Sequence, residues 1–229
     1  MKNLVAFALL WLASGEAFAQ KIIRKSQPFR AGQQVDLQLK FADSIRISYW
    51  DKAEVSVLIA VEVNDGKLND ALVVETSANA RKITVKTDFD QELIRQGKRE
   101  DCPGNNQSYS DGDGYHVCSE INYEVYLPRR ADLRVETING NIFIREVAGP
   151  VYAKSISGFL DVSWPDGKGA NVALKSITGE LYSDLDIDFG NKKEKNPIVG
   201  YLLEGTLNGG GPDVRLESIS NNIYLRKLN

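Results

Sequence analysis

Apolar and polar residues alternate with a period of two along most of the chain after residue 20. The stretches in which this alternation is clearest are Val35–Phe41, Ile45–Ile47, Val55–Val57, Ile83–Val85 and Glu120–Leu127. Because successive side chains of a β-strand point to opposite faces, each stretch is expected to be a strand with one buried face. Helical periodicity is rare; in the window Asp88–Lys98, Asp88 or Asp90 would cap a short helix that ends near Gly97. The pattern predicts an all-β protein.

Four segments in the second half of the chain share one pattern and align without gaps. They are Leu133–Ile144, Val151–Val162, Val172–Ser183 and Val214–Leu225. Each reads apolar, x, apolar, Lys or Glu, Ser or Thr, Ile, small polar, Gly or Asn, x, Ile or Leu. The shared isoleucines are 18, 21 and 42 positions apart, so a degenerate copy is expected between the last two, around Pro197–Leu203. Repeats of about 20 residues are typical of solenoids, in which each turn covers the inner apolar row of the next.

The repeat predicts a parallel β-solenoid in which Leu133–Ile138 pairs with Val151–Ile156 and not with Asn141–Ile144. Two inward ladders are expected, Val135, Ala153, Leu174, Leu216 and Ile142, Leu160, Leu181, Ile223. The structural corners would be Gly140, Gly158, Gly179 and Asn221. Since Gly, and Asn at modest cost, adopt positive φ, these corners are expected to be left-handed. The alternative is a β-sandwich of hairpins, in which Asn139-Gly140 is an ordinary hairpin turn.

The outward positions before the shared Ser or Thr carry charges of both signs. They are Glu136, Lys154, Lys175 and Glu217. If the copies stack in chain order with one missing copy before the last, most neighbouring charges have opposite sign. Exposed pairs of this kind contribute little stability, so they serve only as an indication of register.

Residues 1–19 have the three regions of a signal peptide in order: a positive Lys2, an apolar run Leu4–Ala13, and Ala17-Phe18-Ala19 before the expected cleavage site. A single domain of residues 20–229 is expected, with an irregular loop insertion at 87–119 and clear repeats at 133–229. No Cys follows the cleavage site, and no later stretch is apolar for long enough to span a bilayer. The protein is therefore expected to be exported, periplasmic or secreted, without a transmembrane anchor.

Two cysteines, Cys102 and Cys118, lie sixteen positions apart in a segment rich in Gly, Asn, Asp and Ser. An exported protein meets oxidising conditions, so a disulfide is predicted, which in the chain-entropy model stabilises by about 3 kcal/mol. The alternatives are a free thiol or a metal pair with His116, the only histidine. Zinc ligands usually come in closer pairs than these cysteines. His116 itself is expected to lie in an exposed loop.

The net charge of −3 gives no basic excess for nucleic acid. No catalytic residue is predicted: His116 has no nucleophile at motif spacing, and Gly-x-Ser-x-Gly does not occur. Two acidic sets are candidates for calcium, Asp111 with Asp113 and Asp184 with Asp186 and Asp188. A turn-forming loop and a solvated strand face are their alternatives, and no other cofactor is predicted.

Outward aromatic residues form the last candidate site. Phe143, Tyr182 and Tyr224 share one repeat position, and Tyr152 is outward by parity. Stacking between neighbouring repeats accounts for them, and so does a binding surface for sugar or protein, because aromatic residues are enriched in interfaces.

Several stretches together resemble the bacterial putative-adhesin β-strand repeat domains, which are related to auto-transporter adhesin head domains. They are Ser44–Val61, Tyr123–Ile144, the KSISG and KSITG copies, and Leu203–Lys227. The resemblance covers roughly Val35 to Lys227 and implies a right-handed β-solenoid, exported and at the cell envelope. It supplies no catalytic residues. The insertion at 87–119 and Asn221-Asn222 depart from the pattern.

The sequence therefore predicts an exported, non-enzymatic adhesion, scaffold or binding module at the cell envelope. Its partner would be an envelope protein or a polysaccharide that the sequence does not name, and its oligomeric state stays open. One alternative is a polysaccharide-active β-helix enzyme that uses Asp184, Asp186 and Asp188 with calcium. The other is an accessory component of an envelope signalling system.

Overall fold

The computed structural model describes residues 20–228 except 103–107, 111–113, 191–199 and 201. The predicted signal peptide and the calcium candidates Asp111 and Asp113 lie outside these residues. Within the described part of the chain, no helix is both long and apolar enough to cross a membrane.

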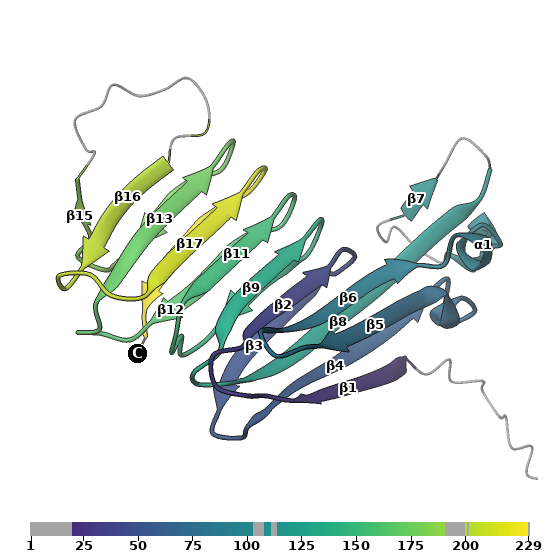
Figure 1. Ribbon diagram of the computed structural model, residues 1–229. Helices are drawn as coiled ribbons and strands as arrows, with labels where there is room; N and C mark the ends of the chain where they lie inside the picture. Colours follow the sequence, from purple (N-terminus) through teal and green to yellow (C-terminus); the bar gives the residue numbers. More distant parts are fainter. Residues whose placement is uncertain (1–19, 103–107, 111–113, 191–199, 201, 229) are drawn as a thin grey trace, which may run out of the picture.

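The described chain folds into two mixed β-sheets (Figure 1). Sheet A has the order β1 (Lys21–Pro28), β4 (Glu54–Val63), β8 (His116–Pro128), β3 (Ser44–Trp50), β10 (Asn141–Ile144), β12 (Leu160–Trp164), β18 (Ile223–Lys227), β14 (Leu181–Ser183), with β7 (Ser108–Ser110) paired to β8. Sheet B has the order β15 (Asp188–Phe189), β16 (Leu202–Leu207), β13 (Ala170–Ser176), β17 (Asp213–Ser218), β11 (Val151–Ser155), β9 (Asp132–Thr137), β2 (Gln34–Leu39), β6 (Lys82–Phe89), β5 (Leu72–Ala78). The helical elements are α1 (Gln91–Ile94) and two 3-10 turns, Asn69–Ala71 and Arg99–Asp101.

The two sheets face each other in a sandwich-like arrangement, with one hydrophobic core between them. The period-two pattern fixes this packing, because alternate residues of β4, β9 and β10 are buried. The largest fully buried side chains include Trp164 of β12 and Tyr123 of β8. The all-β prediction is confirmed.

The predicted parallel pairing between repeats is present. Leu133 of β9 is the register partner of Val151 of β11. Ile142 of β10 is the partner of Leu160 of β12, again in parallel. Both inward ladders point into the core, where only Leu181 at the sheet edge is half-buried. A hairpin at Asn139-Gly140 is therefore excluded.

The predicted order of the repeats is wrong. The last copy, β17 and β18, lies between β11–β12 and β13–β14, so the chain does not wind sequentially. The expected degenerate copy around Pro197–Leu203 lies largely outside the described residues; Leu202–Leu207, which overlaps its end, forms β16, antiparallel to β13. The shared pattern determines which residues face inward, but it does not determine which copies are neighbours. A right-handed solenoid is not confirmed.

The charges at the outward position reflect the true order. Glu136 lies beside Lys154, Lys154 beside Glu217, and Glu217 beside Lys175. Every neighbouring pair is of opposite sign, whereas chain order would place Lys154 beside Lys175.

The predicted left-handed corners are wrong too. Gly140, Gly158, Gly179 and Asn221 all have negative φ. Glycine is needed for space instead: a Cβ on Gly158 would lie 1.9 Å from the carbonyl oxygen of Gly140. A Cβ on Gly179 would lie 2.1 Å from the carbonyl oxygen of Asn221. The corner of one strand pair therefore packs directly on the backbone of the next.

The shared Ser or Thr next to each corner is buried and links neighbouring strand pairs. Ser155 Oγ accepts from the Gly158 N–H at 2.8 Å and donates to the Gly140 carbonyl at 3.0 Å. Ser176 makes the same two bonds with Gly179 and Asn221, both at 2.9 Å. The Ser or Thr shared by the repeats thus satisfies the backbone groups that the corner leaves unpaired inside the core.

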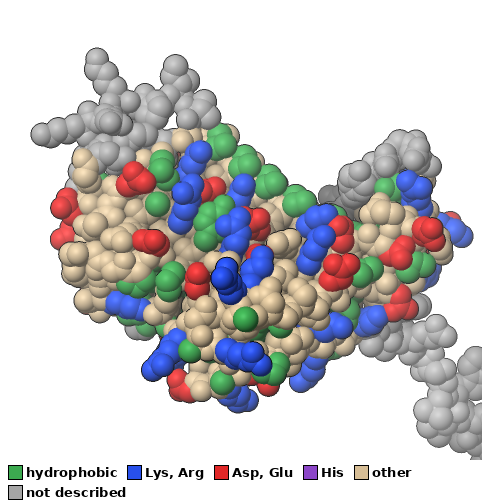
Figure 2. Space-filling model, viewed as in Figure 1, with side chains coloured by type: hydrophobic (Ala, Val, Ile, Leu, Met, Phe, Trp, Pro, Cys, Tyr) green, Lys and Arg blue, Asp and Glu red, His purple; other side chains and the backbone are tan. Residues whose placement is uncertain are grey.

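The shared isoleucines lie on the outside of the corners. Ile138, Ile156 and Ile177 are 36–37% exposed, and Ile219 is half-buried between Ile156 and Ile177. Figure 2 shows hydrophobic side chains in a row along the rim above β9, β11, β17 and β13. The repeat therefore encodes an outer apolar row as well as the inner ones.

The insertion is shorter than the predicted 87–119. β6 continues to Phe89, and Asp90 caps α1 by accepting from the N–H groups of Glu92 and Leu93. The predicted disulfide between Cys102 and Cys118 is present, with Cα atoms 5.7 Å apart. His116 begins β8 and is half-buried, so the prediction of an exposed loop is wrong for it.

Candidate functional site

The outer face of sheet A carries a continuous group of aromatic and arginine side chains, here called the aromatic–arginine face. Its members are Arg46, Phe143, Arg145, Phe159, Asp161, Tyr182, Tyr224 and Arg226. Strand register explains the grouping, since residues from five neighbouring strands lie side by side in the order Arg46, Phe143, Asp161, Tyr224, Tyr182. Their alternate neighbours are the apolar residues that build the core.

The aromatic rings of this face contact one another across the strands. Phe159 meets Phe143 edge-on, with ring centroids 5.2 Å apart, and meets Tyr224 edge-on at 6.1 Å. Tyr224 and Tyr182 stack with centroids 5.1 Å apart and planes 8° from parallel. The predicted stacking is therefore present, and Phe159, which lies just before β12, completes the row.

Asp161 anchors two of the three arginines of the face. Arg145 binds it with two hydrogen bonds of 3.2 Å and also donates to Ser163 at 2.7 Å. Arg226 Nε lies 3.6 Å from the same carboxylate. The side chain of Asp161 is only 9% exposed, because the two arginines cover it. A carboxylate in this position holds both guanidinium groups beside β12 through charge-assisted contacts.

All three arginines of the face also lie over aromatic rings, and the Arg145 guanidinium carbon is 6.0 Å from the centre of Phe143. The Arg46 guanidinium carbon is 5.5 Å from the centre of Phe143, and that of Arg226 is 4.6 Å from the centre of Tyr224. These cation–π contacts restrict the arginine side chains without using all their N–H donors.

Tyr182 is the most exposed ring of the set, at 45%. Its hydroxyl bonds to Glu180, and that hydrogen bond raises the pKa of the phenol, together with a small desolvation and the Glu180 charge. β14 is the last strand of sheet A among the described residues, so no described strand of the sheet covers the ring beyond it.

Tyr152 does not belong to this face. It lies on β11 in sheet B, where Arg134 sits 4.2 Å over its ring. Burial raises the pKa of its phenol, with Glu217 and Glu136 adding to the rise. The four aromatic residues proposed from the sequence are thus divided three to one between the sheets.

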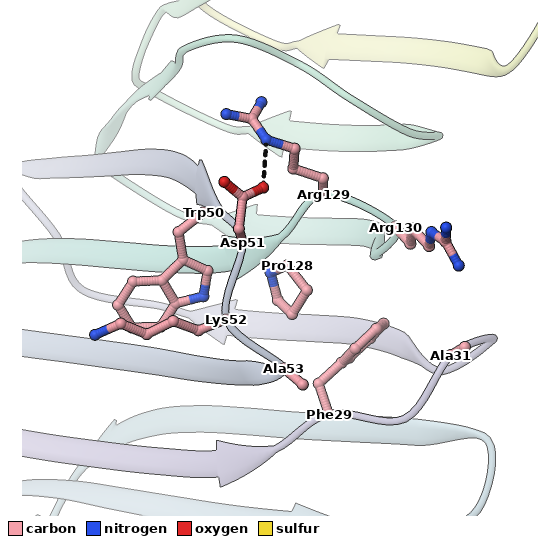
Figure 3. A pocket seen from close by; sticks show the side chains of 9 residues that line it. All are labelled: Phe29, Ala31, Trp50, Asp51, Lys52, Ala53, Pro128, Arg129 and Arg130. Carbon is pink, nitrogen blue, oxygen red and sulfur yellow. Dashed lines mark hydrogen bonds and ion pairs between the residues drawn. The ribbon is translucent and has the colours of Figure 1, made fainter.

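A hollow of about 260 Å³ lies where β3 and β8 end (Figure 3). It is lined by Phe29, Ala31, Trp50, Asp51, Lys52, Ala53, Pro128, Arg129 and Arg130. Arg129 pairs with Asp51 at 2.9 Å, and Lys52 Nζ lies 4.6 Å from the centre of the Trp50 ring. Trp50 also stacks on Tyr126, with ring centroids 5.2 Å apart. Lys52 and Tyr126 thus both lie against the Trp50 ring, so we do not consider this ring a stacking surface for a ligand.

The acidic candidates do not form a metal centre in the described residues. Asp184, Asp186 and Asp188 are exposed and alternate with inward side chains as predicted, but only Asp188 lies in a strand. Asp184 accepts a hydrogen bond from the Lys227 N–H at 2.6 Å. Among the described residues, no three His, Cys, Asp or Glu side chains gather closely enough to hold a metal ion. Calcium binding stays a prediction.

No family model and no curated protein matches the sequence. Three solved structures of similar fold are a "putative cell adhesion protein" from Clostridium sporogenes, a "putative adhesin" from Bacteroides fragilis and a "putative lipid binding protein" from Parabacteroides distasonis. The first has 8% identity and a TM-score of 0.49, covering 90% of this chain and 100% of its own. The second has 8% and 0.30, covering 92% and 98%. The third has 10% and 0.28, covering 91% and 97%. At these values the likenesses give no argument for a shared function.

Proposed function

We propose that this protein is an exported, non-enzymatic binding module of the bacterial cell envelope. It binds its partner with the aromatic–arginine face of sheet A. The observation that carries the proposal is the row of four aromatic rings, from Phe143 to Tyr182, on one outer sheet face. Stacked strands with the same inward pattern act as a solenoid-like scaffold that keeps this row regular.

The face has the properties of a recognition surface. Aromatic and arginine side chains are enriched in interfaces, where they provide large contact areas with few rotatable bonds. Here the rings and guanidinium groups already hold one another in place, so little side-chain entropy is lost on binding. Tyr182 offers the most accessible ring area.

The composition of the face supports binding over catalysis. Its one carboxylate, Asp161, is held by Arg145 and Arg226. Acid–base catalysis needs two titratable groups within reach of a substrate, one protonated and one deprotonated. The defined face does not supply such a pair.

The proposal is tested with immobilised protein and solubilised envelope fractions. We expect the wild-type protein to retain a component that the Tyr182→Ala/Tyr224→Ala double variant retains at least about tenfold less well, since two stacked aromatic contacts are removed. Tyr152→Ala, on sheet B, is the matched control and should behave as wild type. Equal retention by all three proteins, or chemical turnover of the retained component, would contradict the proposal. Melting curves check that each variant is folded.

A further inference from the structure

We infer that the partner of the aromatic–arginine face is an acidic polysaccharide. Its carboxylates bind Arg46 and Arg226, and a sugar ring stacks on the open side of Tyr182. This inference rests on the proposed function and names its ligand class.

The charge of the face differs from that of the whole chain. Three arginines and one carboxylate give the face a formal charge of +2, whereas the chain carries −3. Two acidic residues lie at its margins, Glu124 in register with Arg46 on β8 and Glu180 beside Tyr182. The centre of the face is therefore a positive surface on an acidic protein, which favours a negatively charged partner.

The arginines do not contribute equally. Arg145 is the most occupied, because both of its terminal nitrogens donate to Asp161 and one of them also donates to Ser163. It is a positioning residue for the carboxylate that also holds Arg226.

Arg46 and Arg226 keep donors available. Arg46 donates one N–H to Ser44 at 2.9 Å and forms no ion pair with any described residue. Arg226 approaches Asp161 only with Nε, at 3.6 Å. Both guanidinium groups are held over rings, so their remaining N–H groups are pre-positioned for a bidentate anion such as a carboxylate.

The spacing of the two arginines favours a polymer. β3 and β18 are separated by β10 and β12, so the two strand backbones lie three intervals, or about 14 Å, apart. The guanidinium groups lie at different rings, Arg46 at Phe143 and Arg226 at Tyr224. A chain with repeated carboxylates engages both arginines at once, and the second contact is then intramolecular.

The aromatic rings favour a sugar over an acidic peptide. The parallel pair Tyr224 and Tyr182 ends the sheet as far as the structure describes it, and no described strand lies beside the ring face of Tyr182 turned away from Tyr224. A pyranose presents an apolar C–H face that matches a flat ring of this kind, and its hydroxyl groups suit the polar edge formed by Glu180 and the Tyr182 hydroxyl.

The test uses the full chain and three uronic-acid polymers: polygalacturonate, alginate and hyaluronate. Dissociation constants are measured at low and at moderate salt. We expect at least one polymer to bind, and its neutral methyl-esterified form to bind at least about tenfold more weakly. Binding should weaken as salt rises, because exposed charges are screened. Poly-glutamate tests the acidic peptide and should also bind at least about tenfold more weakly.

Variants locate the site. Arg46→Gln/Arg226→Gln should weaken binding at least about tenfold, the loss expected for charge-assisted hydrogen bonds. Arg30→Gln/Arg81→Gln removes the same charge from two exposed arginines elsewhere and should leave binding unchanged. If the first double variant does not fold, Arg46→Lys keeps the charge, loses the fork and should still weaken binding.

These outcomes distinguish a wrong ligand class from a wrong proposed function. Equal binding of the neutral ester, equal binding of poly-glutamate, or no binding of any uronate polymer overturns the inference. If an envelope component is still retained through Tyr182 and Tyr224, the proposed function stands with another ligand. If nothing is retained, the proposed function fails as well.

Discussion

At the residue scale, the corner positions are controlled by the distance between neighbouring backbones. Gly158 lies against the Gly140 carbonyl, and Ser155 hydrogen-bonds both of these residues. At the corner, the lack of a side chain on Gly158 allows the two backbones to approach, and the buried Ser155 hydroxyl hydrogen-bonds both of them. Asn221 occupies the same position with a side chain, whose amide group donates to the Ser157 carbonyl at 3.4 Å and accepts from the Asn222 N–H at 2.9 Å.

Gly158→Ala should destabilise the protein by about 1–3 kcal/mol, the usual cost of overpacking. The new Cβ would lie 1.9 Å from the Gly140 oxygen, so the backbone has to move. Urea unfolding measures the loss. Gly190→Ala is the control, because a Cβ there meets nothing within 4 Å and its φ is not positive. Equal stability of both variants would contradict the close-approach explanation.

Asp43 should make stability depend on pH in an unusual direction for a carboxylate. Burial raises its pKa above the ordinary 3.8, Glu120 adds to the rise, and the hydrogen bond from the Ile121 N–H opposes it. A raised pKa in the folded state means that the stabilisation is fully present below pH 3.8 and is lost as pH rises through the raised value.

Asp43→Asn removes this titration but keeps an acceptor for the Ile121 N–H. Urea unfolding of wild type and variant between pH 3 and 7 measures the effect. We expect the stability of the variant relative to wild type to increase as pH rises. A constant difference across this range would show that the Asp43 pKa is not raised.

At the element scale, the sequence predicts strands and their facing well because the period-two pattern is set by burial. It also predicts the parallel register, since all copies share the same phase relative to Ser or Thr and Gly. The pattern does not encode which copy lies beside which, because every inward ladder is equally apolar. Only the alternation of Glu136, Lys154, Glu217 and Lys175 distinguishes the true order, and each such contact is weak.

The repeat pattern predicts only part of the candidate site, because it does not encode the order of the strands. Phe143, Tyr182 and Tyr224 were identified because they share a repeat position. Phe159, Arg145 and Arg226 were missed, since they join the face through the order of the strands and through Asp161. The available signal was Asp161, a carboxylate in the repeat position that Phe143, Tyr182 and Tyr224 hold in the other copies, because a carboxylate there favours a cationic neighbour.

Ser155→Ala should cost about 1–3 kcal/mol, because two buried backbone groups lose their partner. These are the Gly158 N–H and the Gly140 carbonyl, and Ser155 itself is fully buried. Ser157→Ala, two residues away and exposed, should change stability by less than about 0.5 kcal/mol. The comparison is made by thermal or urea unfolding. A harmless Ser155→Ala would mean that these hydrogen bonds do not hold the corners together.

At the scale of the whole molecule, the two sheets present different outer faces from similar strands. Sheet A shows aromatic rings and arginines, whereas sheet B shows a row of alternating charges. Both depend on the insertion of β17 and β18 between earlier strands. That insertion places Tyr224 beside Asp161 and Tyr182, and Glu217 between two lysines. The order of strands therefore assembles the candidate binding surface.

Engineered disulfides test this order directly. Lys154 and Glu217 are register partners on adjacent strands, about 4.8 Å apart, which is within the reach of a disulfide. Lys154 and Lys175 are two strand intervals apart, about 9.6 Å, which is beyond it. The Lys154→Cys/Glu217→Cys variant should therefore cross-link under mild oxidation, and Lys154→Cys/Lys175→Cys should keep free thiols. Peptide mapping without reduction identifies the bonds, with Cys102–Cys118 as the internal reference. A cross-link in Lys154→Cys/Lys175→Cys but not in Lys154→Cys/Glu217→Cys would indicate strands arranged in chain order. In that arrangement Tyr224 would not lie beside Asp161, and the aromatic–arginine face would not form.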